Sequence, residues 1–339
     1  MKIQYPSFDL IYTNENLYHA WFKVSLGKSS KSSIVNFYQT LDKNLALIAY
    51  DLKNNTYKPG PYNHFLVKDP KERLIAASPV RDRIVQHALM NYYDIIFDRH
   101  LIFDSYACRI GKGTHKAVLR AFHFAKSSSV LKNTIYFLKM DVRKYFDSIN
   151  HEVLKILLSK IIKDKNVLNL FYTIIDSGDI LSGKGIPIGN LTSQYFANYY
   201  LSGFDHYFKE NLHIKRYIRY MDDIIVFTDN KNDIKSIYEK AACYADEKLR
   251  LKLKPQISGS INNGVPFLGF LIKPAGIYLQ KKTKRRYKAR IAEIEYNRKT
   301  GKITELDAGC RAESVTAHLL IARSKNFRNN VLHGRVLGV

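Results

Sequence analysis

The stretch Arg219-Tyr220-Met221-Asp222-Asp223 lies between two runs, Ile214–Ile218 and Ile224–Phe227, that are rich in β-branched and aromatic residues. Such residues favour strands, so the pattern predicts a β-hairpin whose turn carries two carboxylates. Two carboxylates held beside a buried strand repel each other and need a cation nearby. The stretch therefore predicts a metal site.

Asp141 supplies a further carboxylate, because it follows the apolar run Ile135–Met140. Strand ends are common positions for functional residues, so we expect Asp141 and Asp222 to lie on neighbouring strands. Mg²⁺ prefers oxygen ligands and is usually held by one or two carboxylates together with substrate phosphates. Two such ions can stabilise both the attacking and the leaving oxygen of a phosphoryl transfer. The predicted reaction is attack of a 3′-hydroxyl on the α-phosphate of a nucleotide.

Composition predicts a large protein that binds a polyanion. The chain has 339 residues, a hydrophobic content of 46% and a formal net charge of +24, which favours nucleic acid over an anionic membrane surface as the partner. The longest apolar runs are too short to cross a membrane and no signal-peptide pattern opens the sequence, so we expect a soluble, cytoplasmic protein. Cys108, Cys243 and Cys310 lack metal-ligand spacing and are predicted to be buried, inert thiols.

Tyr220-Met221-Asp222-Asp223 resembles motif C of reverse transcriptases, and the segment from Asp141 to Phe146 resembles their motif A. Further blocks in the same order extend the resemblance over roughly residues 57–272, which is more specific than any single motif. The resemblance implies an RNA-directed DNA polymerase with an α+β, right-hand fold of fingers, palm and thumb. Its antiparallel palm sheet would carry the catalytic residues Asp141, Asp222 and Asp223. It also implies two Mg²⁺ ions, with Mn²⁺ as a substitute, bound by Asp141, Val142, Asp222 and Asp223, of which Asp223 is expected to support the site more than to ligate.

The expected division of the chain follows these motifs. We expect an N-terminal helical extension of the fingers over residues 1–60, the fingers over 61–130 and the palm with motif A over 131–180. The motif B helix is expected over 181–210, the remaining palm over 211–273 and a basic helical thumb over 274–339. Helical periodicity further predicts helices within residues 34–52, 79–97, 151–175 and 233–251, and from the motif B loop to residue 208.

Cationic loops are candidates for nucleotide binding. A hairpin is predicted over residues 65–76, and by the resemblance Lys68 and Arg73 at its loop hold the incoming triphosphate, Arg73 better because its planar guanidinium can bind phosphate bidentately. The block from Ser105 to Ala117 resembles one of the bacterial retroelement reverse transcriptases of the group II intron lineage. On its glycine-containing loop, Arg109 is implied to bind the nucleotide and Lys112 the nucleic acid. Without the resemblance, both segments are ordinary solvated basic loops.

Phe146 lies five residues after Asp141, where reverse transcriptases place an aromatic residue beneath the nucleotide sugar. A bulky ring there would clash with a ribose 2′-hydroxyl, so Phe146 is predicted to select deoxynucleotides. The alternative is that Phe146 is a core aromatic residue.

The segment Ile188-Gly189-Asn190-Leu191-Thr192-Ser193-Gln194 occupies the position of motif B, whose usual form is QGxxxSP. A helix N-terminus behind a glycine turn suits a nucleotide, so Ile188, Gly189 and Gln194 are predicted to shape the nucleotide pocket, with Asn190 or Thr192 capping the helix. The IGNxxSQ form resembles the reverse transcriptases of diversity-generating retroelements, which copy a template-repeat RNA with errors at adenines. Beside template RNA, the cDNA and its primer, and dNTPs, this resemblance implies a small basic accessory variability protein as partner.

A basic segment follows an apolar hairpin. The ten residues from Lys281 to Arg290 include seven basic residues and no acid, and such a run repels itself unless an anion lies against it. We predict a thumb helix that binds the template-primer backbone with strong salt dependence; a solvated basic face or an arm for another RNA are the alternatives. The hairpin from Val265 to Ile272 resembles the primer grip, motif E, of reverse transcriptases, which implies that the primer backbone approaches closely at Gly269; read alone it is an apolar strand. The basic residues predicted to bind nucleic acid are Lys281, Lys282, Lys284, Arg285, Arg286 and Lys288.

Three rival functions remain open. A retron or free-standing group II-like reverse transcriptase would lack the mutagenic role, although neither an NxxH nor a VTG block is found and Gln256–Gly259 stands where VTG is expected. An RNA-directed RNA polymerase is disfavoured by Phe146. A polymerase-like RNA-binding protein is disfavoured by the intact acids.

Overall fold

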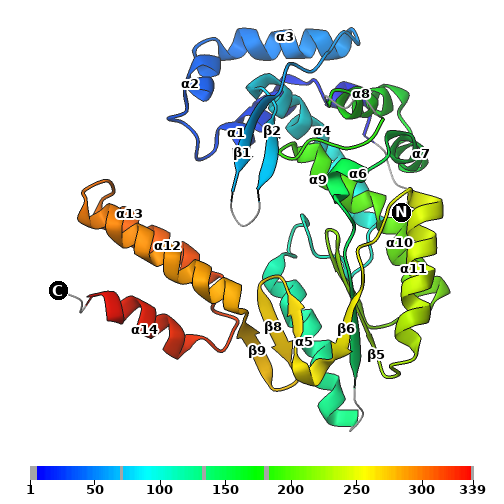
Figure 1. The fold of residues 1–339 in the computed structure, drawn as a ribbon. Helices are drawn as coiled ribbons and strands as arrows, with labels where there is room; N and C mark the ends of the chain where they lie inside the picture. The colour runs from blue at the N-terminus through cyan, green and yellow to red at the C-terminus, as the bar shows by residue number, and fades with distance from the viewer. Residues whose placement is uncertain (1–5, 69–71, 132–134, 179–182, 337–339) are drawn as a thin grey trace. The chain divides into compact units, whose positions relative to one another are not determined.

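The computed structural model describes residues 6–68, 72–131, 135–178 and 183–336 (Figure 1). The chain forms two compact units. The first unit comprises Met1–Phe103, Val142–Leu212 and Ala241–Lys254, and the second comprises Asp104–Asp141, His213–Lys240 and Pro255–Val339. Helices and antiparallel strands occur together, which confirms the α+β class. The division into fingers, palm and thumb segments stays a prediction.

The first unit is mainly helical. Its one sheet within the described residues is the antiparallel hairpin of β1 (Asn63–Val67) and β2 (Arg73–Ala77), as the sequence predicts. Its helical elements are η1 (Phe8–Leu10), α1 (Asn14–Ser25), α2 (Ser32–Gln39), α3 (Leu41–Lys53), α4 (Val80–Arg99), α6 (Tyr145–Ser148), α7 (His151–Ile161), α8 (Lys165–Asp176), α9 (Leu191–Tyr200), α10 (Ser202–His206) and the π-helical turn η2 (Tyr207–Asn211).

An aromatic cluster forms the core of this unit. The ring of Phe171 on α8 lies 6.0 Å from that of Phe97 on α4 and 5.6 Å from that of Phe196 on α9, both edge-on. Edge-to-face contacts of this kind add to the burial of the rings themselves. Three helices far apart in sequence are thereby packed together, including the helix that follows motif B.

Three predicted helices are interrupted in the structure. The pattern within residues 34–52 divides at Thr40, whose φ of −129° is not helical. The pattern over residues 151–175 divides because the Asp164 side chain accepts hydrogen bonds from the backbone N–H groups of Asn166 and Val167 and so begins a new helix, α8. The motif B helix divides at Leu201. Apolar periodicity continued across each break, which concealed it in the sequence.

The second unit contains a four-stranded antiparallel sheet in the order β4-β5-β3-β6. Figure 1 labels two of its strands, β5 and β6. Its strands are β3 (Tyr136–Met140), β4 (Tyr217–Tyr220), β5 (Asp223–Thr228) and β6 (Ile257–Ser260). A second antiparallel sheet contains β7 (Val265–Phe267), β8 (Phe270–Lys273) and β9 (Gly276–Leu279). The helical elements are α5 (Thr114–Leu131), η3 (Ile261–Asn263), α12 (Lys281–Lys299), α13 (Glu305–Ala317) and α14 (Lys325–Val336), while α11 (Asp233–Leu249) begins in this unit and ends in the first.

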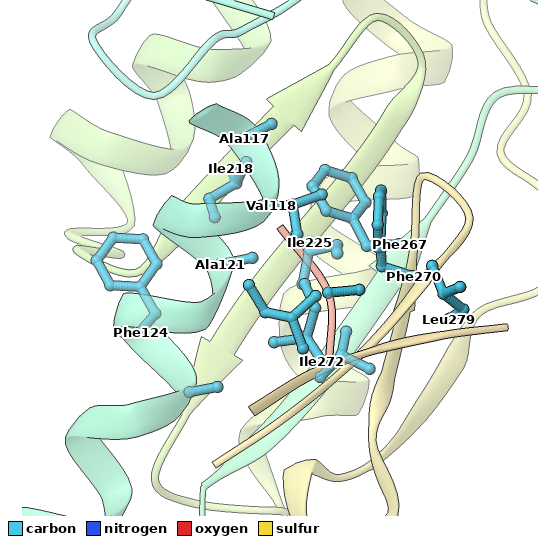
Figure 2. Packing of buried hydrophobic residues seen from close by; sticks show 14 of the residues in the cluster. Ala117, Val118, Ala121, Phe124, Ile218, Ile225, Phe267, Phe270, Ile272 and Leu279 are labelled. Carbon is cyan, nitrogen blue, oxygen red and sulfur yellow. The ribbon is translucent and has the colours of Figure 1, made fainter. Parts of the chain in front are cut away.

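One apolar core joins α5 to both sheets. In Figure 2, Ala117, Val118 and Ala121 of α5 face Ile218 of β4 and Ile225 of β5, and Phe267, Phe270 and Leu279 of the smaller sheet converge on the same centre. Alternation along each strand places these residues on one face. The core therefore fixes the β4–β5 hairpin relative to the β7–β9 sheet.

Two further expectations can be compared with the structure. Cys108, Cys243 and Cys310 are all exposed, so the prediction of buried thiols is wrong; Cys243 and Cys310 lie on the solvent-facing sides of α11 and α13, and Cys108 lies in a loop with a positive φ of 50°. Within the described part of the chain, no helix is both long and apolar enough to span a bilayer.

Candidate metal and nucleotide site

The two acids of the central motif lie on a tight turn. β4 and β5 pair up to Tyr220 and Asp223, which leaves Met221 and Asp222 as the turn residues, and Met221 has a φ of 55°. The Arg219 side chain donates from Nη1 to the Met221 carbonyl oxygen at 3.1 Å. The β-hairpin predicted from the flanking strands is confirmed, and its turn presents Asp222.

Register places Asp141 beside the hairpin. The last pair between β3 and β5 is Met140 with Ile224, so Asp141, one residue further, lies opposite Asp223. Directly opposed residues of an antiparallel pair point to the same face. Tyr220, Asp223 and Asp141 therefore form one row across three strands, and Asp222 lies at the end of that row. This is the arrangement that the sequence predicts for acids on neighbouring strands.

The next row of residues on the same face of the sheet is largely apolar. Ile218, Ile225 and Lys139 are paired across β4, β5 and β3, and Ile218 and Ile225 are completely buried. Lys139 is the one cation of the described core strands on this face, and its Nζ lies 2.9 Å from Asp223 Oδ2. A lysine beside two buried isoleucines needs an anion to offset its loss of hydration. Sequence reasoning missed Lys139, although a charge within a predicted buried strand was the signal that could have found it.

Arg219 was also missed, and it is fully buried. Its backbone N–H donates to the Asp104 carbonyl oxygen at 3.0 Å, and its own carbonyl oxygen accepts from the Tyr106 N–H at 3.0 Å. The carboxylate of Asp104 pairs with Arg120 Nε at 2.9 Å. The segment before α5 thus runs alongside β4 and supports the strand that ends in the acidic turn.

The donor set suits hard cations. Asp141, Asp222 and Asp223 are each partly exposed and offer carboxylate oxygens, the ligands that Mg²⁺ and Mn²⁺ prefer. Among the residues that the structure describes, no three Asp, Glu, His or Cys side chains form a ready-made metal cluster. Asp223 is in an ion pair with Lys139, and the metal-binding roles of Asp141, Asp222 and Asp223 stay predictions.

Residues predicted to shape the nucleotide pocket gather in the first unit. The Ala76 N–H of β2 donates to the Ile188 carbonyl oxygen at 2.9 Å, which attaches the motif B loop to the β1–β2 hairpin. Gly189 has a φ of 129°, and a Cβ there would lie 2.8 Å from the Ala76 carbonyl oxygen, so no larger residue fits. Arg73 lies on the same strand three residues earlier, with its side chain exposed. Arg73 lies on β2, and the motif B loop with Ile188 and Gly189 is hydrogen-bonded to that same strand.

The other residues predicted to bind the nucleotide lie on α6, at the start of α9 and just after β1. Phe146 lies on the short helix α6, half-buried, and its carbonyl oxygen accepts from the Ile186 N–H at 2.9 Å, which connects motif A to the start of the motif B loop. Gln194 is exposed on the first turn of α9. Asn190 is at the N-cap position, yet its side chain donates to the Tyr62 hydroxyl at 2.8 Å and makes no capping hydrogen bond. Lys68 is exposed just after β1, and the tip of that hairpin lies outside the described residues.

The glycine-containing loop before α5 belongs to the second unit. Arg109 donates from Nη1 to the Ser105 carbonyl oxygen at 2.9 Å, and Lys112 Nζ lies 4.9 Å from the centre of the Tyr106 ring. Burial and the neighbouring Asp104 raise the pKa of Tyr106 to about 12, so the phenol that Lys112 contacts is uncharged at neutral pH. Arg109 and Lys112 therefore both contact residues of their own loop.

The predicted thumb helix exists as α12, and its basic side chains are exposed while Thr283, Tyr287 and Ile291 are buried. Thr283 donates to the Gly269 carbonyl oxygen at 2.7 Å, and a Cβ at Gly269 would lie 2.9 Å from Thr283 Oγ1. The close approach that Gly269 permits in this structure is therefore that of α12. Primer contact at Gly269 stays a prediction.

Known proteins resemble this chain in sequence. A family model described as reverse transcriptase (RNA-dependent DNA polymerase) matches residues 65–272. Protein YkfC of Escherichia coli (strain K12) is 24% identical over 268 residues, which are 66% of this chain and 70% of that protein. The group II intron-encoded protein LtrA of Lactococcus lactis subsp. cremoris is 24% identical over 176 residues, which are 48% of this chain and 28% of LtrA.

A solved structure shares the fold. The structure of apo telomerase from Candida tropicalis has a TM-score of 0.52 and 14% identity, and the match covers 67% of this chain and 49% of that one. At this identity the likeness shows the fold alone, which is the right-hand polymerase fold predicted from the sequence. The chain matches about half or less of both the telomerase and LtrA.

Proposed function

The chain belongs to the reverse transcriptase (RNA-dependent DNA polymerase) family, and from this premise we propose that it copies RNA into DNA by a two-metal mechanism. The observation that carries the proposal is the strand register that sets Asp141 opposite Asp223 and beside the Asp222 turn. Carboxylates gathered at strand ends of a polymerase fold suit nucleotidyl transfer.

The chain's own residues have separate tasks in this proposal. Asp141 and Asp222, with the Val142 carbonyl oxygen, would hold the two Mg²⁺ ions, which when bound lower the barrier to attack by the primer 3′-hydroxyl and to departure of pyrophosphate. Lys68, Arg73 and Arg109 bind the triphosphate. Each is a cation on or beside a loop, and the exposed guanidinium of Arg73 can take two phosphate oxygens at once.

Sugar selection is assigned to Phe146. Its backbone carbonyl oxygen accepts from the Ile186 N–H, which holds α6 beside the motif B loop, and a ring placed at the sugar from there would clash with a 2′-hydroxyl. Incorporation of each dNTP and each rNTP onto a primed RNA template tests this role. We expect a strong preference for dNTPs that falls in Phe146→Ala; equal use of rNTPs by the unaltered protein would contradict the proposal and favour an RNA polymerase.

We further propose the mutagenic subclass, in which the enzyme copies a template-repeat RNA with errors at adenines and acts with a small basic accessory protein. The support is Ile188, where related enzymes have glutamine. An aliphatic side chain lacks the amide that would contact the nucleotide, and the Ala76 hydrogen bond holds Ile188 in a defined position.

Ile188→Gln tests the subclass. Restoring the amide is expected to lower misincorporation opposite template adenine by roughly threefold or more, the scale of one neutral hydrogen bond, while errors opposite other bases change little. Sequencing of cDNA made from one RNA template by both proteins measures this. The control is Ile156→Gln, the same replacement at an exposed isoleucine on α7, which is expected to leave the error spectrum unchanged. An unchanged error spectrum in Ile188→Gln would remove the subclass and leave the polymerase.

An accurate, group II-like reverse transcriptase is the second candidate. The observation in its favour is that the relatives named above include a group II intron-encoded protein. Accurate cDNA from the unaltered protein, in the presence of its template RNA, would select this candidate.

A further inference from the structure

Lys139 makes contacts that tie three strands of the second unit together. Its Nζ donates to Asp223 Oδ2 on β5 at 2.9 Å and to the Pro266 carbonyl oxygen on β7 at 3.1 Å. The ammonium also lies 6.0 Å from the centre of the Phe267 ring. The side chains of Lys139 and Asp223 are 17% and 21% exposed, so the pair is shielded from water and salt.

The position of Lys139 explains these contacts. It lies two residues before Asp141 on β3 and on the same face, with buried Ile225 opposite it. Its neighbours on one side are apolar, and on the other side are the acids of the site. The four-carbon stem can therefore pack on the core while the ammonium reaches the carboxylate of Asp223.

We propose that Lys139 is a positioning residue that keeps Asp223 as a structural anion, links the acidic hairpin to the β7–β8 hairpin, and sets how strongly the acid site takes up a divalent cation. This inference rests on the proposed function, since it concerns the same acids. A positive charge at hydrogen-bond distance offsets the negative charge of Asp223 and lowers the attraction of this part of the site for a cation. Asp141 and Asp222 then define where a cation is held.

The ion pair also has a mechanical consequence. Pro266 lies on β7, just before Phe267 and the Leu268–Gly269 turn. The hydrogen bond from Lys139 on β3 therefore fixes the position of the β7–β8 hairpin relative to the strand that leads to Asp141. Because proline has no N–H of its own, the Pro266 carbonyl oxygen is the polar group through which this residue is held. Loss of Lys139 would free both the carboxylate and the hairpin.

Mn²⁺ binding to the protein without nucleotide or nucleic acid tests the electrostatic part. Measured by calorimetry or by the electron paramagnetic resonance of free Mn²⁺, Lys139→Met is expected to bind Mn²⁺ about tenfold more tightly. Lys139→Arg, which keeps the charge, is expected to bind Mn²⁺ as the unaltered protein does. Unchanged Mn²⁺ affinity in Lys139→Met would overturn the proposal.

A matched control comes from another lysine–aspartate pair. Lys155 Nζ lies 2.6 Å from Asp176 Oδ2 in the first unit, and Lys155→Met removes the same charge outside the acid site. No change in Mn²⁺ affinity is expected there. A tenfold change in this control as well would show a net-charge effect and overturn the assignment to Lys139. Should Lys139→Met fail to fold, Lys139→Gln, whose amide is still a donor, carries the same prediction.

Thermal unfolding tests the link between the hairpins. The losses in melting temperature from Lys139→Met and Asp223→Asn are expected to be clearly less than additive in the double variant, because each removes the same ion pair. Additive losses would contradict the link. Neither measurement requires turnover, so failure of the unaltered protein to make cDNA would remove the proposed function, whereas unchanged Mn²⁺ affinity with normal cDNA synthesis would remove only the role of Lys139.

Discussion

At the scale of single residues, the acidic turn depends on side chains that lie behind it. Arg219 is fully buried in β4, and its Nη1 hydrogen bond to the Met221 carbonyl oxygen restrains the turn that presents Asp222. A charged donor buried in this way stabilises the fold only while its acceptors remain in place. Arg219 therefore connects the stability of β4 with the placement of Asp222, the acid proposed to be catalytic.

Replacing Arg219 measures this connection. Arg219→Met is expected to lower the free energy of unfolding by about 1.5–3 kcal/mol, the scale of a buried hydrogen bond from a charged group, and to reduce cDNA synthesis as well. Urea unfolding followed by circular dichroism gives the first quantity. The control is Arg250→Met, whose exposed ion pair with Glu152 predicts a smaller loss of about 1 kcal/mol or less. Equal losses in the two variants would contradict the special role of Arg219.

Sequence alone was sufficient for the acids and insufficient for their supports. Asp141 and Asp222 each follow a run of strand-forming residues, so pattern and spacing located both. Lys139 and Arg219 also lie within strands, but their roles depend on partners in other segments, Pro266 and Met221, that pairing register brings near. The helix interruptions at Thr40 and Asp164 were hidden for a related reason. The backbone of Thr40 is not helical and the Asp164 side chain caps a new helix, while the apolar pattern continues across both positions.

At the scale of elements, the basic helix α12 is fastened to the β7–β8 turn. Thr283 and Gln280 both donate to the Gly269 carbonyl oxygen, at 2.7 and 3.1 Å, and Tyr287 and Ile291 bury the same face in the core of the second unit. The basic side chains then point away from that core. The sequence predicted the helix and the hairpin but not their attachment, which joins residues 14 positions apart.

Gly269 is the residue on which this attachment depends. Gly269→Ala is expected to destabilise the protein by about 1–3 kcal/mol, because its φ of 90° is strained for alanine and a Cβ would meet Thr283 Oγ1 at 2.9 Å. Thermal unfolding measures the loss. Gly301→Ala is the control, since Gly301 also has a positive φ, of 68°, but nothing lies within 4 Å of a Cβ there. A loss no greater than that of the control would show that Thr283 moves aside without cost.

At the scale of the whole molecule, charge is concentrated where nucleic acid is expected. The net charge is +24, and α12 alone carries seven basic residues in its first ten. Neutralising phosphates releases bound counterions, so binding to the backbone should be independent of sequence and weaken steeply with salt.

Salt titration of primed-template binding tests the basic face. Lys281, Lys282 and Arg285 are exposed, and their joint replacement by glutamine is expected to reduce the slope of log K against log salt concentration by about 2–3. The control replaces Lys231, Lys235 and Lys240, exposed residues at α11, with the same change in net charge. Equal changes of slope in both triple variants would indicate a general charge effect and contradict a specific basic face on α12.

The central claim is that the protein synthesises DNA on an RNA template with metal ions held by Asp141 and Asp222. The most direct measurement is extension of a DNA primer on an adenine-containing RNA template, with dNTPs and Mg²⁺, by the unaltered protein, Asp222→Asn and the control Asp229→Asn. Asp229 lies just beyond the other end of β5 and pairs with Arg216. The account predicts extension by the unaltered protein and by Asp229→Asn, abolished by chelating the metal and reduced at least a thousandfold in Asp222→Asn. Extension by Asp222→Asn at the unaltered rate would contradict it.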